Sequence, residues 1–151
     1  MDFTGSQKVK APRQQVFQAL LTPEVIKNSV PGCDEAAFED FPTGRQLKLT
    51  ITPNIPGIGG SHTIYVQTGE VVPGSRVELI TEPSSSLGTV RARVTADLTD
   101  DAEGTLLSYT AHADREGKVA AIPEMIVKGA VKVALDQFFK NFEKQVSSIT
   151  A

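Results

Sequence analysis

Apolar side chains recur every three to four residues through the last quarter of the chain, from residue 118 to about residue 147. Residues four apart lie on one face of an α-helix. The pattern therefore predicts one long amphipathic helix, with about 24 residues from Glu124 onward, and Pro123 in or just before its first turn. The main apolar ridge is Ile122, Ile126, Ala130, Ala134, Phe138, Phe142 and Val146, opposite a lysine-rich ridge.

Upstream of this helix the apolar period changes to two, which is typical of strands with one buried face. Short connections rich in Gly, Pro and Asp separate the strands, and this favours antiparallel pairing between neighbours. Together with an N-terminal strand over 2–10, seven strands are expected. The other six are 36–41, 45–52, 62–72, 76–82, 89–98 and 105–116.

Two short helices are predicted after the first strand, because Pro12 and Pro23 each precede apolar residues at helical spacing and proline is favoured in a first helical turn. The order is then strand, two short helices, six strands and a long helix. This order predicts an α+β fold in which a curved, seven-stranded antiparallel sheet wraps around the C-terminal helix. We expect a single domain over residues 1–151, without a linker or repeat.

Small residues occur on both predicted inner surfaces, such as Ala92 and Ala111 on the sheet and Gly129 on the helix. Because a curved sheet with a small-residue centre leaves space beneath a helix, we expect a cavity there. The candidate ligand-binding residues are Leu47, Leu49, His62, Ile64, Val66, Leu79, Val90, Ala92, Val94, Leu107, Tyr109, Ala111, Ile122, Met125, Ile126, Gly129 and Val133.

These inward positions are expected to contain no charged residue, which favours binding over catalysis because proton transfer needs a positioned ionisable group. Tyr109 either satisfies its hydroxyl within the core or presents it to a ligand. His62 is a weak candidate for a general base, and His112 is expected to be solvated. Cys33 has no nearby histidine in sequence, so a structural role is favoured over a nucleophilic one.

Composition narrows the classes of partner. A net charge of −3 over 151 residues argues against nucleic acid, whose binding domains are usually basic. One cysteine excludes an intrachain disulfide and disfavours a zinc site, so neither a metal nor another cofactor is expected. The sequence has no signal-peptide pattern and no run of 18 apolar residues, which predicts a cytoplasmic protein. The lysine-rich ridge allows peripheral contact with an anionic membrane or an acidic partner.

The segments VKAPRQQVFQALLTPEVIKNSVPGCDE (9–35) and GKVAAIPEMIVKGAVKVALDQFFKNFEKQV (117–146) resemble the CoxG family of carbon monoxide dehydrogenase proteins. That family belongs to the START/Bet v 1-like helix-grip superfamily, so the resemblance implies a hydrophobic cavity between the sheet and the long helix. It also implies an accessory role beside a carbon monoxide dehydrogenase or related molybdenum hydroxylase. The carboxy-terminal extension of longer family members is not found here. The loop at 53–60 is either a lid over the cavity or a plain connector.

The sequence therefore favours non-catalytic binding of an apolar or amphipathic molecule, lipid-like or quinone-like. Because no inward charge is expected, affinity should depend little on ionic strength. Two alternatives remain open. One is an enzyme of the same superfamily, such as a polyketide cyclase or aromatase, that would use Tyr109 or His62. The other is a protein-interaction module whose interior is filled by its own side chains.

Overall fold

The computed structural model describes residues 1–42, 44–52, 60–82, 84–85 and 88–150, so the candidate lid at 53–59 lies outside the described residues. The predicted order of elements is confirmed. Strand β1 (Asp2–Val9) is followed by α1 (Arg13–Leu20) and α2 (Pro23–Ser29). The strands that follow are β2 (Cys33–Phe41), β3 (Gly44–Ile51), β4 (His62–Val72), β5 (Arg76–Thr81), the two-residue β6 (Ser84–Ser85), β7 (Gly88–Asp101) and β8 (Gly104–Glu116).

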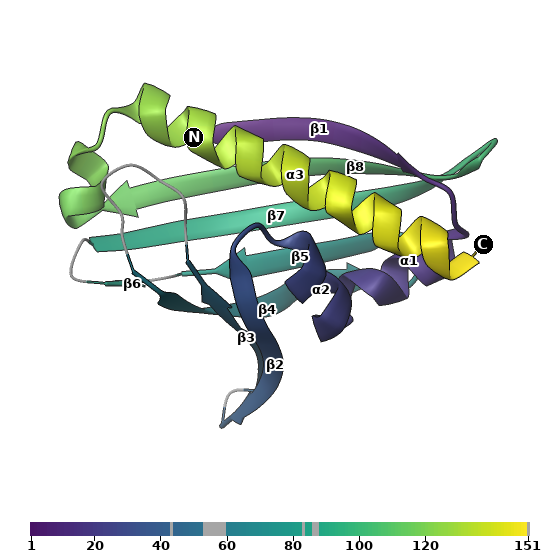
Figure 1. Cartoon of the computed structure of the whole chain (residues 1–151), viewed down its shortest axis with the longest axis horizontal. Helices are drawn as coiled ribbons and strands as arrows, with labels where there is room; N and C mark the ends of the chain where they lie inside the picture. The colour runs from purple at the N-terminus through teal and green to yellow at the C-terminus, as the bar shows by residue number, and fades with distance from the viewer. Residues whose placement is uncertain (43, 53–59, 83, 86–87, 151) are drawn as a thin grey trace.

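The main path of the sheet has the order β1-β8-β7-β5-β4-β3-β2, and β6 pairs beside it with β7. Every described strand pair is antiparallel, as the short connections predict. The N-terminal strand closes one edge by pairing with β8, where Asp2 lies opposite His112 and Val9 opposite Thr105. The first and last strands of the chain are thus neighbours, and the sheet forms one continuous curved surface (Figure 1).

Helix α3 (Glu124–Thr150) crosses the inner face of this sheet, after a short 3-10 turn, η1 (Gly117–Ala121) (Figure 1). Pro123 directly precedes it, where the missing N–H of proline removes no helical hydrogen bond. The Arg115 guanidinium donates to the carbonyl of Ile122, 2.9 Å away, and so ties this start to β8. None of the described helices is both long enough and apolar enough to cross a lipid bilayer.

The core lies between the second half of α3, the helix α1 and the β1–β8–β7 side of the sheet. Its largest fully buried side chains are Phe142 and Leu107, followed by Val9, Val16 and Val146. Helix α2 packs beside α3, where the side-chain amides of Asn141 and Gln145 donate to Ser29 and Val25. The second half of α3 is therefore held by both apolar contacts and hydrogen bonds.

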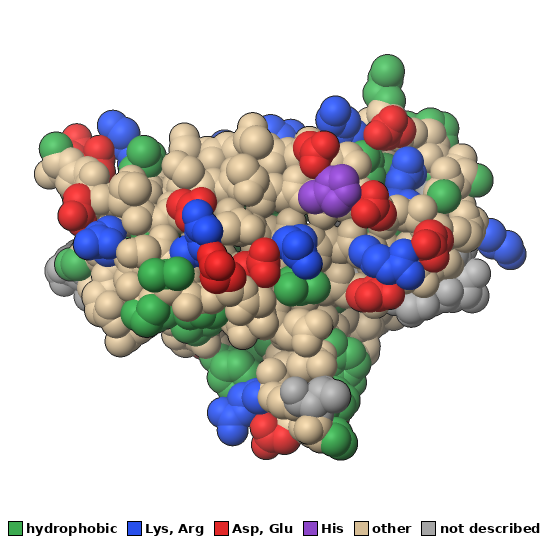
Figure 2. Space-filling model, turned by 180° about the vertical axis from the view of Figure 1, so that it is seen from behind, with side chains coloured by type: hydrophobic (Ala, Val, Ile, Leu, Met, Phe, Trp, Pro, Cys, Tyr) green, Lys and Arg blue, Asp and Glu red, His purple; other side chains and the backbone are tan. Residues whose placement is uncertain are grey.

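The outer face of the sheet is polar and carries acidic and basic side chains in alternation (Figure 2). Arg76 bridges Asp97 at 2.6 Å and Glu70 at 2.8 Å, and Arg91 bridges Glu116 at 2.7 Å. Because these groups are exposed, each pair adds little to stability. The arrangement matches a sheet that is covered on one face only.

Candidate functional site

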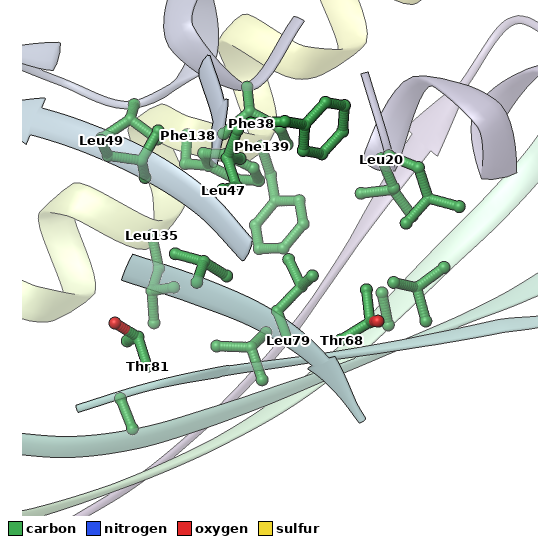
Figure 3. A pocket seen from close by; sticks show the side chains of 18 of the residues that line it. Leu20, Phe38, Leu47, Leu49, Thr68, Leu79, Thr81, Leu135, Phe138 and Phe139 are labelled. Carbon is green, nitrogen blue, oxygen red and sulfur yellow. The ribbon is translucent and has the colours of Figure 1, made fainter. Parts of the chain in front are cut away.

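A pocket of about 390 Å³ lies between the sheet and the helices. Strands β3, β4, β5 and β7 form its floor, and the edge strand β2 contributes one residue. Helices α1, α2 and the second half of α3 form its roof (Figure 3). Its lining consists of Leu20, Leu21, Ile26, Val30, Phe38, Arg45, Leu47, Leu49, Val66, Thr68, Val77, Leu79, Thr81, Ala92, Val94, Ala96, Leu135, Phe138 and Phe139.

Strand register explains how the floor is assembled. Leu47 pairs with Val66, Val66 with Thr81, and Thr81 with Ala92, so one row of inward side chains runs across four strands. Leu79 pairs with Val94 in the neighbouring row. Because residues two apart on a strand share a face, the same alternation that makes the outer face polar makes this floor apolar.

The roof is built around three residues of α3, Leu135, Phe138 and Phe139. In Figure 3, Phe138 and Phe139 lie on one side of the pocket, while Leu79 and Thr81 project from the sheet on the other. The two phenylalanine rings meet edge to face, with centroids 4.9 Å apart. These roof residues were not among the candidates, although the apolar ridges of the predicted helix contain them.

Six of the seventeen sequence candidates lie around this pocket: Leu47, Leu49, Val66, Leu79, Ala92 and Val94. They come from the central strands of the sheet. The candidates on β8, namely Leu107, Tyr109 and Ala111, lie instead in or against the packed core. The difference arises because α3 packs toward the β1–β8 edge, which leaves the open space over β3 to β7.

Tyr109 illustrates this displacement. Its ring stacks on Phe139 with centroids 4.4 Å apart, and the Lys132 ammonium donates to its hydroxyl oxygen at 3.3 Å. Gly5 lies opposite on β1, where an added Cβ would meet the Tyr109 ring at 2.6 Å. Of the two interpretations offered by the sequence, the structure shows the hydroxyl satisfied within the protein.

The five candidates in and before the first half of α3 are also absent from the pocket lining: Ile122, Met125, Ile126, Gly129 and Val133. Met125 is 86% exposed and Val133 69% exposed. A Cβ added to Gly129 would meet nothing within 4 Å. The helical period correctly places these residues on the apolar side of the helix, but the pocket begins about one turn later, at Leu135.

His62, Ile64 and Val90 are half-buried and lie outside the lining. His112 is on the outer face, with Nδ1 2.6 Å from Asp2 Oδ1 and Nε2 3.2 Å from Asp114. The hydrogen bond to Asp2 raises the pKa of His112, and Asp114 adds to the effect. Burial raises the pKa of the Cys33 thiol, which is the opposite of what activates a nucleophilic cysteine.

Arg45 corrects the expectation that the inward positions are uncharged, because its side chain lines the pocket. It shares a strand face with Leu47 and Leu49, so the alternation already contained this signal. The side chain remains 62% exposed, which places its charge at the mouth and not in the interior. Among the described residues, no group of three His, Cys, Asp or Glu side chains could hold a metal ion.

Comparison with known proteins gives a family and a fold. No curated protein matches the sequence with significance. A crystal structure of a conserved protein from Geobacillus kaustophilus is similar, with 26% identity, coverage of 98% of this chain and 96% of that chain, and a TM-score of 0.84.

Two more distant structures share the fold. A START superfamily protein from Mycobacterium smegmatis is 15% identical over 98% of both chains, with a TM-score of 0.74. The di-domain ARO/CYC StfQ from the steffimycin biosynthetic pathway is 13% identical, over 99% of this chain and 51% of that one, with a TM-score of 0.71. The family model for the carbon monoxide dehydrogenase protein CoxG matches residues 5–147. The chain, a helix-grip protein, therefore belongs to the carbon monoxide dehydrogenase CoxG family.

Proposed function

We propose that the protein binds an apolar or amphipathic small molecule, lipid-like or quinone-like, in the pocket beneath α3, and that it does not convert this molecule chemically. The observation that carries the proposal is the lining itself. All of its residues are apolar except Arg45, Thr68 and Thr81. Family membership supports an accessory role beside a carbon monoxide dehydrogenase or related molybdenum hydroxylase.

The size of the pocket and the strength of the hydrophobic effect are compatible with this role. The volume of about 390 Å³ is within the range of about 300–1,000 Å³ that small-molecule sites occupy. A ligand that buries about 300 Å² of apolar surface would gain about 7 kcal/mol before the entropic costs of association. Micromolar affinity requires about 8 kcal/mol, so shape fit alone accounts for weak to moderate binding.

The polar groups of the lining favour binding over catalysis. Arg45 stays protonated at neutral pH and so is poorly suited to transfer protons. The Thr81 hydroxyl already donates to the carbonyl of Tyr65 at 2.8 Å. Tyr109 and His62, the groups that an enzyme of this fold was expected to use, are not lining residues.

Binding can be measured with the neutral fluorophore N-phenyl-1-naphthylamine. Ala92 faces the pocket, while Arg93, the next residue on β7, faces outward and pairs with Glu78. Ala92→Phe should fill the site and weaken probe binding at least tenfold, whereas Arg93→Phe should change it less than twofold. Circular dichroism melts of both variants would check folding. Equal affinities in the two folded variants would contradict the assignment of the pocket.

Native mass spectrometry of freshly purified protein tests the same proposal without a chosen probe. A carried apolar molecule, released on denaturation, is the expected result. Turnover of a polyketide-like substrate would support the enzyme alternative. Failure to bind any apolar molecule, together with stable capture of a carbon monoxide dehydrogenase-type complex, would support the interaction-module alternative.

A further inference from the structure

The mouth of the pocket is marked by a pair of residues from the β2–β3 hairpin, Phe38 and Arg45, which both line it. The guanidinium carbon of Arg45 lies 5.3 Å from the centroid of the Phe38 ring. Stacking of this kind restricts the orientation of the guanidinium plane. Arg45 therefore presents a positive group of defined direction at the edge of an apolar space.

A carboxylate holds one side of this guanidinium. Asp40 lies opposite Arg45 across the two strands, and Arg45 Nε donates to Asp40 Oδ1 at 3.0 Å. Asp40 is 78% exposed, so water competes for the pair and it is weak. A guanidinium has five N–H donors, and this contact uses one of them.

The charge distribution of the lining is one-sided. Among the nineteen described residues around the pocket, Arg45 is the one charged group, and none of them is a carboxylate. A positive group at the mouth of an apolar space discriminates against cationic ligands and favours anionic ones. Carboxylates match the planar fork of a guanidinium especially well.

We propose that Arg45 binds the anionic head group of the ligand, and hence that the preferred ligand class is a carboxylate-headed amphiphile with an apolar tail in the pocket. This inference rests on the function proposed above. Phe38 positions the guanidinium, and Asp40 competes with the ligand for it. Replacing Arg45 and replacing Asp40 should therefore shift affinity in opposite directions.

The test compares cis-parinaric acid with its methyl ester, two fluorescent probes that share a tail and differ in head-group charge. Both are titrated below their aggregation concentrations at pH 7.5, where the acid is ionised. Arg45→Gln should weaken binding of the acid about tenfold, the usual worth of a charge-assisted hydrogen bond, and should change ester binding less than twofold. Arg91→Gln, on the outer face, is the matched control and should alter neither affinity.

Asp40→Asn sharpens the test, because it should tighten binding of the acid by about two- to fivefold and leave the ester unchanged. Binding of the acid to the wild type should also weaken as salt rises, while binding of the ester should not. If both probes bind and Arg45→Gln leaves their relative affinity unchanged, the head-group assignment is overturned and the proposed function stands. If neither probe binds the wild type, the proposed function fails as well.

Discussion

The two halves of α3 carry similar apolar ridges but meet different surroundings. In the second half Phe139, Phe142 and Val146 are buried against the core, and Phe142 is fully covered. In the first half Met125, Ile126 and Val133 are exposed, although Val127 is buried. An amphipathic period specifies which side of a helix is apolar; it does not specify how much of that side is covered.

The difference follows from what each half packs against. Helix α2 lies beside the second half and donates or accepts hydrogen bonds at Ser29 and Val25. The first half is held near the sheet through Lys132, whose ammonium contacts Tyr109 and the carbonyl of Thr4. Coverage, and with it the position of the pocket, therefore depends on where α1 and α2 lie.

The largest expected effect tests this contrast directly. Phe142→Ala should lower the free energy of unfolding by about 3–5 kcal/mol, because it leaves a cavity in the covered half. Val133→Ala, in the exposed half, should change it by no more than about 0.5 kcal/mol. Urea denaturation of both variants would measure the two values. Similar losses would mean that the halves are equally packed.

A smaller effect is expected at Tyr109. Tyr109→Phe removes the hydrogen bond from Lys132 and should cost about 0.5–1 kcal/mol of stability. Because the hydroxyl faces Lys132 and not the pocket, affinity for N-phenyl-1-naphthylamine should be unchanged. Probe titration beside urea denaturation separates the two readouts. A loss of affinity with unchanged stability would put the hydroxyl back at the ligand.

Gly129 gives an effect of opposite sign. Gly129→Ala should raise stability by about 0.5–1 kcal/mol, since alanine is the better helix former and the added methyl meets open space. Gly5→Ala is the matched control and should destabilise, because the same methyl would collide with the Tyr109 ring. Thermal melts suffice for both. Destabilisation by Gly129→Ala would mean that this part of the helix is covered after all.

The smallest effect concerns the exposed outer face, at His112. Its pKa is raised by Asp2, so its contribution to stability is full below its ordinary pKa of about 6.5 and is lost as pH rises through the raised value. The pKa of Asp2 is lowered by the same hydrogen bond, so that contribution is lost as pH falls through the lowered value. Between pH 6 and pH 8, the wild type should lose slightly more melting temperature than His112→Gln. Parallel curves for the two proteins would show that the pair adds nothing.

The candidate site shows how far local patterns reach. Six floor residues, Leu79 and Val94 among them, were predicted because strand alternation assigns each side chain to a face. Arg45 obeys the same alternation, and it was missed because the strand was expected to be uniformly apolar on its inner face. The roof residues Phe138 and Phe139 lay within the predicted helix, but no local pattern distinguishes them from Ile126 or Val133.

Local periodicity and turn residues by themselves determined the elements, their antiparallel order, the single wet face of the sheet and the long amphipathic helix. These properties depend on residues a few positions apart. Only the tertiary structure decided that α3 lies toward β1 and β8, that Tyr109 is closed off behind Phe139, and that the pocket opens over β3 to β7 beside Arg45. Such features depend on contacts between residues that are distant along the chain, such as Ser29 with Gln145, and the crossing of helix and sheet that creates these contacts leaves no period in the sequence.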